Sequence, residues 1–427
     1  MSTGSKKRSN TAAGKRQKNL VKKPRISIVR DEKPSITKIP GLVLTFGQGD
    51  VGQLGLGTSI TERGKPSLVK TLENIVDVCA GGMHTVCLSK DGVVYTFGCD
   101  DEGALGREAT DENSFEPGQV SLPGSAVQIT AGDSHSAALL DDGRVFAWGS
   151  FRDSHGAMGL TVQGKEKRPI QLLQDKVITK IASGADHLVM LTFDGQLYTC
   201  GCAEQGQLGR VSNRFSSRES RQGLSHLLLP GRILFNKRSK YDFIDVWATS
   251  YCTFAKEKTK GIFAFGLNNY NQLGLANEKP QFHPVVSKTF DSSKNWVKIT
   301  GGQHHTMALD ENGKVYVLGR KDYGRLGLGK NCEDAKELTL VSTLSNDECT
   351  DIACGSSVSF AVTKSGACYA WGMGSNGQLG MGDDDSDIFE PSKILGKQLE
   401  GKNVHLVSAG GQHTVLLVLT AVSNGST

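Results

Sequence analysis

The stretch Gly47-Gln-Gly-Asp-Val-Gly-Gln-Leu-Gly55 decides the fold, because its pattern of glycines returns along the chain. The motif has a glycine, four variable residues, a second glycine, one further residue, an aliphatic residue and a third glycine. Its seven copies begin at Gly47, Gly98, Gly149, Gly201, Gly266, Gly319 and Gly372, at intervals of 51, 51, 52, 65, 53 and 53 residues. A period near 50 residues predicts a repeat architecture rather than a series of unrelated domains.

Each repeat also carries the pattern of a β-hairpin. Between His84 and Gly98, apolar residues alternate on both sides of an Asp91-Gly92 pair, which favours a tight turn. The turn returns at Asp142-Gly143, Asp194-Gly195 and Asn312-Gly313. Seven small antiparallel sheets at even spacing predict an all-β fold, a seven-bladed β-propeller.

The two ends of the repeat region complement each other. The segment 42–47 begins in the middle of a repeat, and the last repeat stops after the strand-like segment that ends at Val418. We expect the N-terminal strand to complete the C-terminal blade, which removes exposed sheet edges. The predicted organisation is a basic tail at 1–39, a propeller at 40–420 and a short tail at 421–427.

Charge divides the chain at the start of the propeller. The whole chain of 427 residues has a formal net charge of +5, but residues 1–39 hold twelve Lys or Arg and two acids, so the remainder is negative. We expect this tail to be disordered in isolation and to act in nuclear import or nucleic-acid contact. A solvated tail without a specific partner is the alternative. The cluster Lys6, Lys7 and Arg8 is assigned to nucleosome or DNA binding. The clusters Lys15 and Arg16, and Lys22, Lys23 and Arg25, are assigned to the import signal.

Several classes of protein are not expected. No stretch of 18 apolar residues and no secretory signal is visible, and the ten cysteines contain no CxxC pair. The pattern indicates free thiols in a reducing compartment. We expect no membrane segment, no metal and no cofactor.

Three stretches resemble the regulator of chromosome condensation family: 47–57, Gly149-Ser-Phe-Arg-Asp153 and Gly301-Gly-Gln-His-His305. The similarity covers about residues 40–420. It implies a monomeric guanine-nucleotide exchange factor for the GTPase Ran, bound to nucleosomes through histones and DNA and carried into the nucleus by an import receptor. It also implies that Ran-GTP is made near chromosomes for nuclear transport, spindle assembly and nuclear envelope formation, with partial dispersal in mitosis. Related propellers that serve as photoreceptors use a tryptophan cluster, whereas the four tryptophans here are scattered.

Function in a repeat protein is expected where one repeat departs from the others. The third motif, from Gly149 to Gly159, spans ten positions instead of eight. The resemblance implies that the added segment is a β-wedge pressed against the GTPase; a tolerated loop insertion is the alternative. Its residues are Ser150, Phe151, Arg152, Asp153, Ser154 and His155.

The interval of 65 residues marks a second departure. It adds about 13 residues after Arg210, in a polar and basic segment. Arginine suits bidentate contacts with carboxylates and phosphates. Arg214, Arg218 and Arg221 are therefore predicted to contact a histone acidic surface or DNA; an ordinary exposed loop is the alternative.

A histidine occupies one repeated position, at His84, His135, His187, His305 and His413. Repetition predicts a structural role, a buried hydrogen bond shared between blades. Two repeats depart, with Tyr251 and Ser357 near the corresponding place.

The residues beside these histidines are not required by the repeat. They include Asp133, Asp186 and His304, and equivalent positions on one propeller face would form a ring. The resemblance assigns GTPase contacts to Asp50, Asp133, Asp186, Arg210, His304 and His413. Asn271 stands where the family commonly has a contacting histidine.

No nucleophile elbow, Walker motif or metal-ligand cluster is present in the sequence. Together with this absence, the resemblance implies nucleotide exchange on a partner, by stabilisation of the nucleotide-free GTPase and without covalent chemistry. A non-catalytic chromatin scaffold is the main alternative, and a propeller enzyme for a small molecule is a third.

Overall fold

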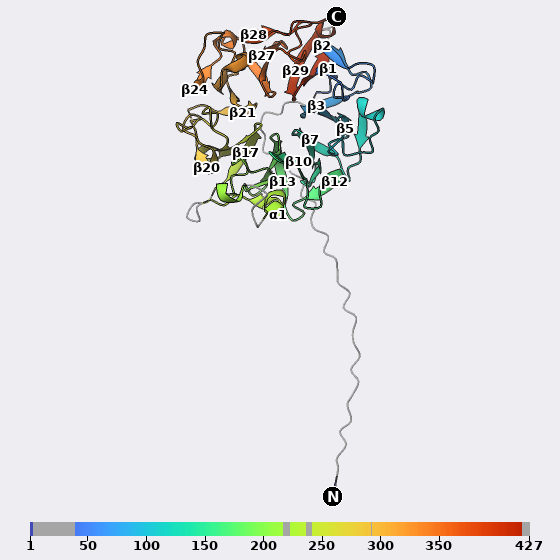
Figure 1. Ribbon diagram of the computed structural model, residues 1–427, viewed down its shortest axis with the longest axis vertical. Helices are drawn as coiled ribbons and strands as arrows, with labels where there is room; N and C mark the ends of the chain where they lie inside the picture. Colours follow the sequence, from blue (N-terminus) through green and yellow to red (C-terminus); the bar gives the residue numbers. More distant parts are fainter. Residues whose placement is uncertain (3–38, 217–222, 236–240, 292, 421–427) are drawn as a thin grey trace, which may run out of the picture.

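Seven antiparallel sheets stand around a common centre in the computed structural model, which describes residues 1–2, 39–216, 223–235, 241–291 and 293–420 (Figure 1). Each sheet has four strands, and we call the sheets blades 1 to 7. The predicted seven-bladed propeller is confirmed. No described helix is long and apolar enough to cross a membrane.

The first three blades contain the two insertions. Blade 1 comprises β3 (Ile75–Ala80), β4 (His84–Ser89), β5 (Val94–Gly98) and β6 (Gly118–Val120). Blade 2 comprises β7 (Ala126–Ala131), β8 (His135–Leu140), β9 (Val145–Gly149) and β12 (Glu166–Leu172). Blade 3 comprises β13 (Ile178–Ser183), β14 (His187–Thr192), β15 (Leu197–Gly201) and β16 (Gly231–Arg232).

The next three blades follow the same order. Blade 4 comprises β17 (Phe243–Ala248), β18 (Cys252–Glu257), β19 (Gly261–Gly266) and β20 (Gln281–Val286). Blade 5 comprises β21 (Trp296–Gly301), β22 (His305–Asp310), β23 (Val315–Gly319) and β24 (Ala335–Leu340). Blade 6 comprises β25 (Cys349–Cys354), β26 (Val358–Thr363), β27 (Cys368–Gly372) and β28 (Ile388–Lys393).

Blade 7 closes the ring with strands from both ends of the chain. It comprises β29 (Lys402–Ala409), β30 (His413–Thr420), β1 (Leu42–Gln48) and β2 (Glu62–Leu68). β1 pairs with β30 from Leu42 opposite Val418 to Gly47 opposite His413. The predicted pairing of the ends is confirmed, and β30 has a partner on each side instead of a free edge.

Short elements lie in the connections between strands. A two-stranded sheet, β10 (Phe151–Asp153) and β11 (Gly156–Gly159), interrupts blade 2, and helix α1 (Gly223–Leu228) follows β15 at the outer edge of blade 3 (Figure 1). The 3-10 turns are η1 (Asn113–Phe115), η2 (Asn213–Phe215), η3 (Asp322–Gly324), η4 (Ser342–Leu344) and η5 (Lys397–Leu399).

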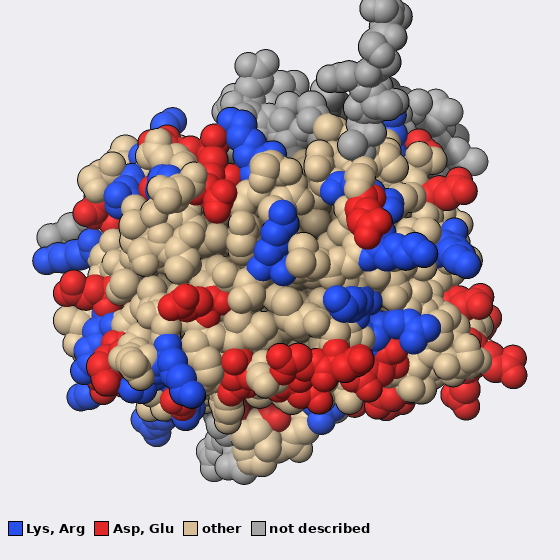
Figure 2. Space-filling view, turned by 90° about the horizontal axis from the view of Figure 1, so that it is seen from above, with Lys and Arg blue, Asp and Glu red and all other residues tan. Residues whose placement is uncertain are grey.

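Burial follows the order of strands in a blade. Every residue of the second strand is buried in blades 1, 2, 3, 5 and 6, because this strand packs against the neighbouring blade on each side. The outer strand β20 contains no buried residue. Figure 2 shows the edge formed near blades 6 and 7, where a row of Asp and Glu runs along one side.

The first glycine of each motif has a backbone conformation that favours glycine. All seven have φ between 96° and 119°. At Gly98, an added Cβ would lie 2.6 Å from the Cα of His84. The glycine periodicity therefore reflects a close approach between the second and third strands.

The repeated histidines connect neighbouring blades. Each Nε2 lies 2.8 to 3.0 Å from a hydroxyl of the following blade, and the five rings are buried. The predicted structural role is confirmed. The pairs are His84 with Ser136, His135 with Ser183, His187 with Thr253, His305 with Ser359, and His413 with Thr85.

These contacts define the protonation of the rings. The Ser136 hydroxyl donates to the carbonyl of Ala104 at 3.0 Å, so it accepts from Nε2–H of His84. Burial lowers the pKa of His84 to about 4 and that of His187 to about 3, so the rings are neutral. The two departures were misplaced by one residue, because Cys252 and Val358 stand opposite Gly266 and Gly372 where other repeats have histidine.

Charged pairs between inner strands were not expected from the sequence. Lys298 Nζ of blade 5 lies 2.6 Å from Asp351 Oδ1 of blade 6, and Lys180 of blade 3 pairs with Asp245 of blade 4. Asp245 and Asp351 are buried. The acid and the base lie on different repeats, so packing of one blade against the next brings them together.

Candidate functional site: a carboxylate-lined face

Strand connectivity places two sets of loops at the same edge of every blade. The turn from the first to the second strand and the glycine motif after the third strand both lie at this edge, because successive strands run antiparallel. We call this edge of the propeller the loop face. Asp133, Asp186 and His304 lie in the turns, and Asp50 lies in a glycine motif. The structure therefore puts all four on one face.

Asp133 and Asp186 form the centre of the site. They come from the turns of blades 2 and 3, and the charge of Asp133 acts on Asp186. Burial and then this repulsion raise the pKa of Asp186 to about 7. Burial also raises the pKa of Asp133, against the opposing effect of Arg152. Such shifts indicate a functional site, since the fold does not require either carboxylate.

The β10–β11 hairpin is joined to this pair. The backbone N–H of Arg152 donates to Asp186 Oδ1 at 2.7 Å, and its guanidinium lies 3.4 Å from Glu102 Oε1. Ser154 donates to Glu204 from its backbone N–H at 3.1 Å and from its hydroxyl at 2.5 Å. Acids from the turns and loops of blades 1 and 3 therefore hold the tip of a hairpin that belongs to blade 2.

The wedge prediction needs one correction. The added segment is a β-hairpin, but Ser150 and Phe151 are fully buried at its base. The Phe151 ring packs against His135 at 4.6 Å between centroids, and the Ser150 hydroxyl accepts from Gly159 N–H at 3.1 Å. These two residues anchor the hairpin and do not reach its surface. Arg152, Ser154 and His155 are exposed at the tip, and Asp153 is half-buried.

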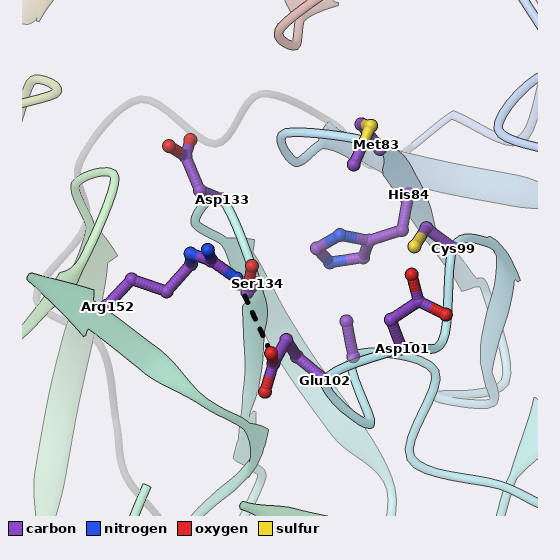
Figure 3. Close-up of a pocket in the computed structure, with 9 residues that line it drawn as sticks. Met83, His84, Cys99, Asp101, Glu102, Asp133, Ser134 and Arg152 are labelled. Carbon is purple, nitrogen blue, oxygen red and sulfur yellow. Dashed lines mark hydrogen bonds and ion pairs between the residues drawn. The ribbon is translucent and has the colours of Figure 1, made fainter. Parts of the chain in front are cut away.

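A small hollow opens beside the hairpin (Figure 3). Its volume is about 70 Å³, and Asp133, Arg152 and Glu102 line it from three different segments. Pockets that enclose small ligands are typically several hundred Å³ or larger. The hollow cannot enclose a nucleotide, so the geometry favours contact with a protein surface. Its remaining lining residues are Met83, His84, Cys99, Asp101, Ala104 and Ser134.

His304 lies across the ring in blade 5. Its ring is half-buried and meets Tyr270 of blade 4 edge-on at 5.3 Å. Burial, with the charges of Arg325 and Arg320, lowers the pKa of His304. The neutral ring is therefore a polar group at the loop face and not a cation.

Two predicted contact residues have other surroundings. Arg210 donates to the carbonyls of Thr199, His226, Leu227 and Leu229, and Arg107 makes the equivalent contacts in blade 1. His413 is buried against Thr85. Arg210 is half-buried with its guanidinium bonded to these carbonyls, and His413 is fully buried, so neither side chain contacts Asp186 or the hairpin in the structure.

Asp50 and Asn271 differ in exposure. Asp50 is exposed and accepts from Gln53 Nε2 at 3.2 Å. Asn271 replaces a motif glycine, has a φ of 59° and is buried, with its amide donating to Leu275. Asn271 therefore supplies no group to the face.

The basic segments predicted to contact nucleosomes are described only in part. Arg214 is exposed in η2, with its guanidinium over the Phe215 ring. Outside the described residues lie Arg218, Arg221, Lys6, Lys7, Arg8, Lys15, Arg16, Lys22, Lys23 and Arg25.

Sequence reasoning missed Glu102 and Glu204, although a signal was present. Glu204 and Asp101 occupy the same motif position as Asp50, and Glu102 is the next residue along. Comparison of the seven motifs position by position would have found them. Among the described residues, Asp153, His155 and Glu204 have ligand atoms within 4.8 Å of one another. Hydrogen bonds from Ser154 and the His155 backbone account for this arrangement.

The comparisons with known proteins agree with the fold. Residues 42–416 match the family model of the RCC1-like domain. A regulator of chromosome condensation from Homo sapiens is 54% identical over 385 residues, which cover 89% of this chain and 91% of the human protein. A Saccharomyces cerevisiae protein named guanine nucleotide exchange factor SRM1 is 28% identical over 431 residues, 87% of this chain and 86% of that protein.

Two solved structures of yeast Prp20 are similar throughout. One is described with its binding properties to Gsp1p and histones; it has a TM-score of 0.81 and 26% identity, covering 90% of this chain and 93% of its own. The other is bound to Kap60 and has a TM-score of 0.81 and 25% identity, covering 94% and 97%. These comparisons place the chain in the class of RCC1-like seven-bladed propellers. Within it, the chain belongs to the regulator of chromosome condensation family.

Proposed function

We propose that this chain is a guanine-nucleotide exchange factor for the GTPase Ran and that it binds Ran on the loop face. One observation carries the proposal: a hairpin that the repeat does not need is held by Asp186 and Glu204, beside a hollow too small for a nucleotide. The family includes proteins named for nucleotide exchange, and one structural neighbour is described with binding to Gsp1p and histones.

The exposed tip of the hairpin is the part that would act on the GTPase. Arg152 to His155 displace groups that hold the phosphates and Mg²⁺ of the partner, while Asp186 fixes the backbone at Arg152. The factor binds the empty GTPase more tightly than the loaded one, so linkage weakens nucleotide affinity in the ternary complex. Exchange of GDP for GTP and of GTP for GDP are both accelerated, and no covalent step is required.

The carboxylates supply the complementary charge for a basic surface of Ran. Asp133, Asp186 and Asp50 are direct contacts in this proposal, with His304 as a neutral polar contact. Arg210 and His413 act indirectly by holding the loops and strands beneath them. Asp186 and His304 are half-buried, whereas Asp50 and Asp133 are exposed, so we expect Asp186 and His304 to contribute more of the binding energy.

Chromatin attachment belongs to other segments. Arg214, Arg218 and Arg221 are proposed to meet histones or DNA, and the basic tail at 1–39 is proposed to meet DNA and an import receptor. The structural neighbour bound to Kap60 supports the import assignment. Residence in the nucleus on chromatin follows, with Ran-GTP supplied there for transport, spindle assembly and nuclear envelope formation.

The deciding experiment is release of a fluorescent GDP analogue from Ran by catalytic amounts of the full chain. Release of the analogue that is faster with the chain than without it, in the presence of excess GTP or GDP, supports exchange activity. Binding to nucleosomes and to Ran without faster release would identify a non-catalytic scaffold instead. The exposed pair Arg144 and Asp142 lies outside the loop face, so Arg144→Glu is a control expected to leave release unchanged.

A further inference from the structure

A second group of residues on the loop face departs from the repeat. We call Tyr270, His304, Arg320 and Tyr323 the aromatic–arginine patch. Tyr270 and Tyr323 occupy the same motif position in blades 4 and 5. Other repeats have Val51, Glu102, Gln205 and Asn376 there. The repeat therefore does not require tyrosine at either place.

Contacts within the patch hold an arginine at its centre. The Arg320 guanidinium lies over the Tyr270 ring at 5.1 Å, and its Nε donates to Asp322 Oδ2 at 2.5 Å. The Arg320 backbone N–H donates to the carbonyl of His304 at 2.9 Å. The side chain remains about one-third exposed. The stacking on Tyr270 and the ion pair with Asp322 therefore hold the Arg320 guanidinium in one orientation, with part of it exposed at the loop face.

Tyr323 is held in a strained conformation and faces solvent. Its φ is 62°, and 47% of the residue is exposed. A non-glycine residue in this region costs free energy that the surrounding structure must offset. Asn376 at the equivalent position also has a positive φ, of 81°, and asparagine tolerates this conformation better than tyrosine. Folding alone would favour asparagine at 323.

Guanidinium and phenol donors gather at the patch, beside the carboxylate of Asp322. Arg325 is 2% exposed and lies beneath Tyr323, with its Nη1 atom buried and without a hydrogen-bond partner among the described residues. Arginine has five donors and no acceptor, and each tyrosine adds a hydroxyl donor. Carboxylates are the protein groups that match clustered guanidinium and phenol donors. The buried Nη1 of Arg325 is out of reach of a partner, so the exposed part of the Arg320 guanidinium and the Tyr323 hydroxyl are the donors that a partner's carboxylate would meet.

The carboxylate cluster of Glu102, Asp133, Asp186 and Glu204 lies on blades 1 to 3, whereas the patch lies on blades 4 and 5. The hairpin belongs to blade 2 and Arg320 to blade 5, three blades further in a ring of seven. A nucleotide that the hairpin displaces from the GTPase would therefore lie too far around the ring to bind the patch. One protein partner that spans the ring meets both regions.

We propose that the aromatic–arginine patch binds an acidic segment of the GTPase, opposite the basic segment that meets the carboxylate cluster. The loop face is then bipolar, and its polarity fixes the orientation in which the hairpin reaches the nucleotide site. This inference rests on the proposed exchange function. Complementary charge of this kind acts mainly on association rate and orientation.

The test compares Arg320→Glu with Arg144→Glu in the full chain. Both arginines pair with an aspartate two residues away, and their side chains are 34% and 35% exposed. Stopped-flow association with nucleotide-free Ran is measured at low and high salt. Arg320→Glu is expected to slow association about fivefold or more at low salt, with a smaller difference at high salt, while Arg144→Glu matches the wild type.

Two further variants keep the inference falsifiable if Arg320→Glu folds poorly. Asp322→Asn leaves Arg320 without its neutralising partner and is expected to speed association. Tyr323→Asn introduces the residue type that blade 6 has at the equivalent position, Asn376. It is expected to weaken binding to Ran with the fold intact. If all three variants associate with nucleotide-free Ran at the wild-type rate, the patch does not bind an acidic segment. In that case, faster nucleotide release by the wild type would still support the exchange function. No release by the wild type would refute the exchange function itself.

Discussion

The backbone N–H of Arg152 donates a 2.7 Å hydrogen bond to Oδ1 of Asp186. Arg152 is on the hairpin of blade 2, and Asp186 is in a turn of blade 3. One carboxylate therefore has two roles: it supplies charge to the loop face and fixes the position of the hairpin. The two roles can be separated by substitution.

Asp186→Ala removes both roles, whereas Asp186→Asn keeps an oxygen that can accept from Arg152 N–H. We expect the alanine variant to reduce Ran nucleotide release by roughly 30-fold, equivalent to about 2 kcal/mol for an interface anchor. The asparagine variant should lose less. Release rates for both, with circular dichroism to verify folding, check this. Equal losses would show that positioning of the hairpin contributes nothing.

Exchange is expected to depend on pH through Asp186. Its pKa is raised to about 7 by burial and by Asp133, so the carboxylate gains its charge as pH rises through 7. Binding to a basic surface should therefore strengthen between about pH 6 and pH 8. Asp133→Asn removes the repulsion and should move the midpoint to lower pH.

A control variant distinguishes the titration of Asp186 from the titration of groups on Ran itself. Asp186→Asn cannot ionise at this position, so the part of the pH profile that belongs to Asp186 should vanish in this variant. Release rates are compared for the three proteins over the same buffers. A profile identical in wild type and Asp186→Asn would rule out Asp186 as the titrating group.

The inter-blade histidines are expected to set the acid stability of the propeller. Burial lowers their pKa values to about 3 or 4, below the value of about 6.5 in an unfolded chain. Their neutral forms stabilise the fold fully above pH 6.5, and this contribution falls as pH decreases toward 4. Urea unfolding should show each histidine adding up to about 1.4 kcal/mol of destabilisation per pH unit in this window.

A single substitution tests the same contacts. His187→Ala removes the bond to Thr253 and should lower the free energy of unfolding by about 1 to 3 kcal/mol at pH 7. Its pH dependence below 6.5 should also be weaker than that of the wild type. An unchanged acid profile would mean that His187 does not contribute.

Two truncations should separate targeting from closure. Removal of residues 1–39 leaves β1 in place and is expected to spare nucleotide release in solution while weakening DNA attachment. Removal of residues 1–48 deletes β1 and exposes the edge of β30, which should cause aggregation or unfolding. Size-exclusion chromatography and release assays distinguish the two. Loss of release with the shorter deletion would assign the tail a role beyond targeting.

The sequence by itself determined the repeat, the number of blades and their closure. The seven motif glycines need positive φ wherever the chain turns after the third strand, so the physical constraint is local and can be read from spacing. The histidines could be assigned a structural role for the same reason. The departures from the repeat also located the hairpin and Asp186.

Only the tertiary structure decided which of these residues act together. Glu102, Asp186 and Glu204 come from three separate segments, and packing of blades 1 and 3 on either side of blade 2 brings them around the hairpin. Burial separated Phe151 from the exposed Arg152 beside it and removed His413 from the surface. A side chain's exposure and charge environment depend on neighbouring blades, which a repeat pattern within one blade does not specify.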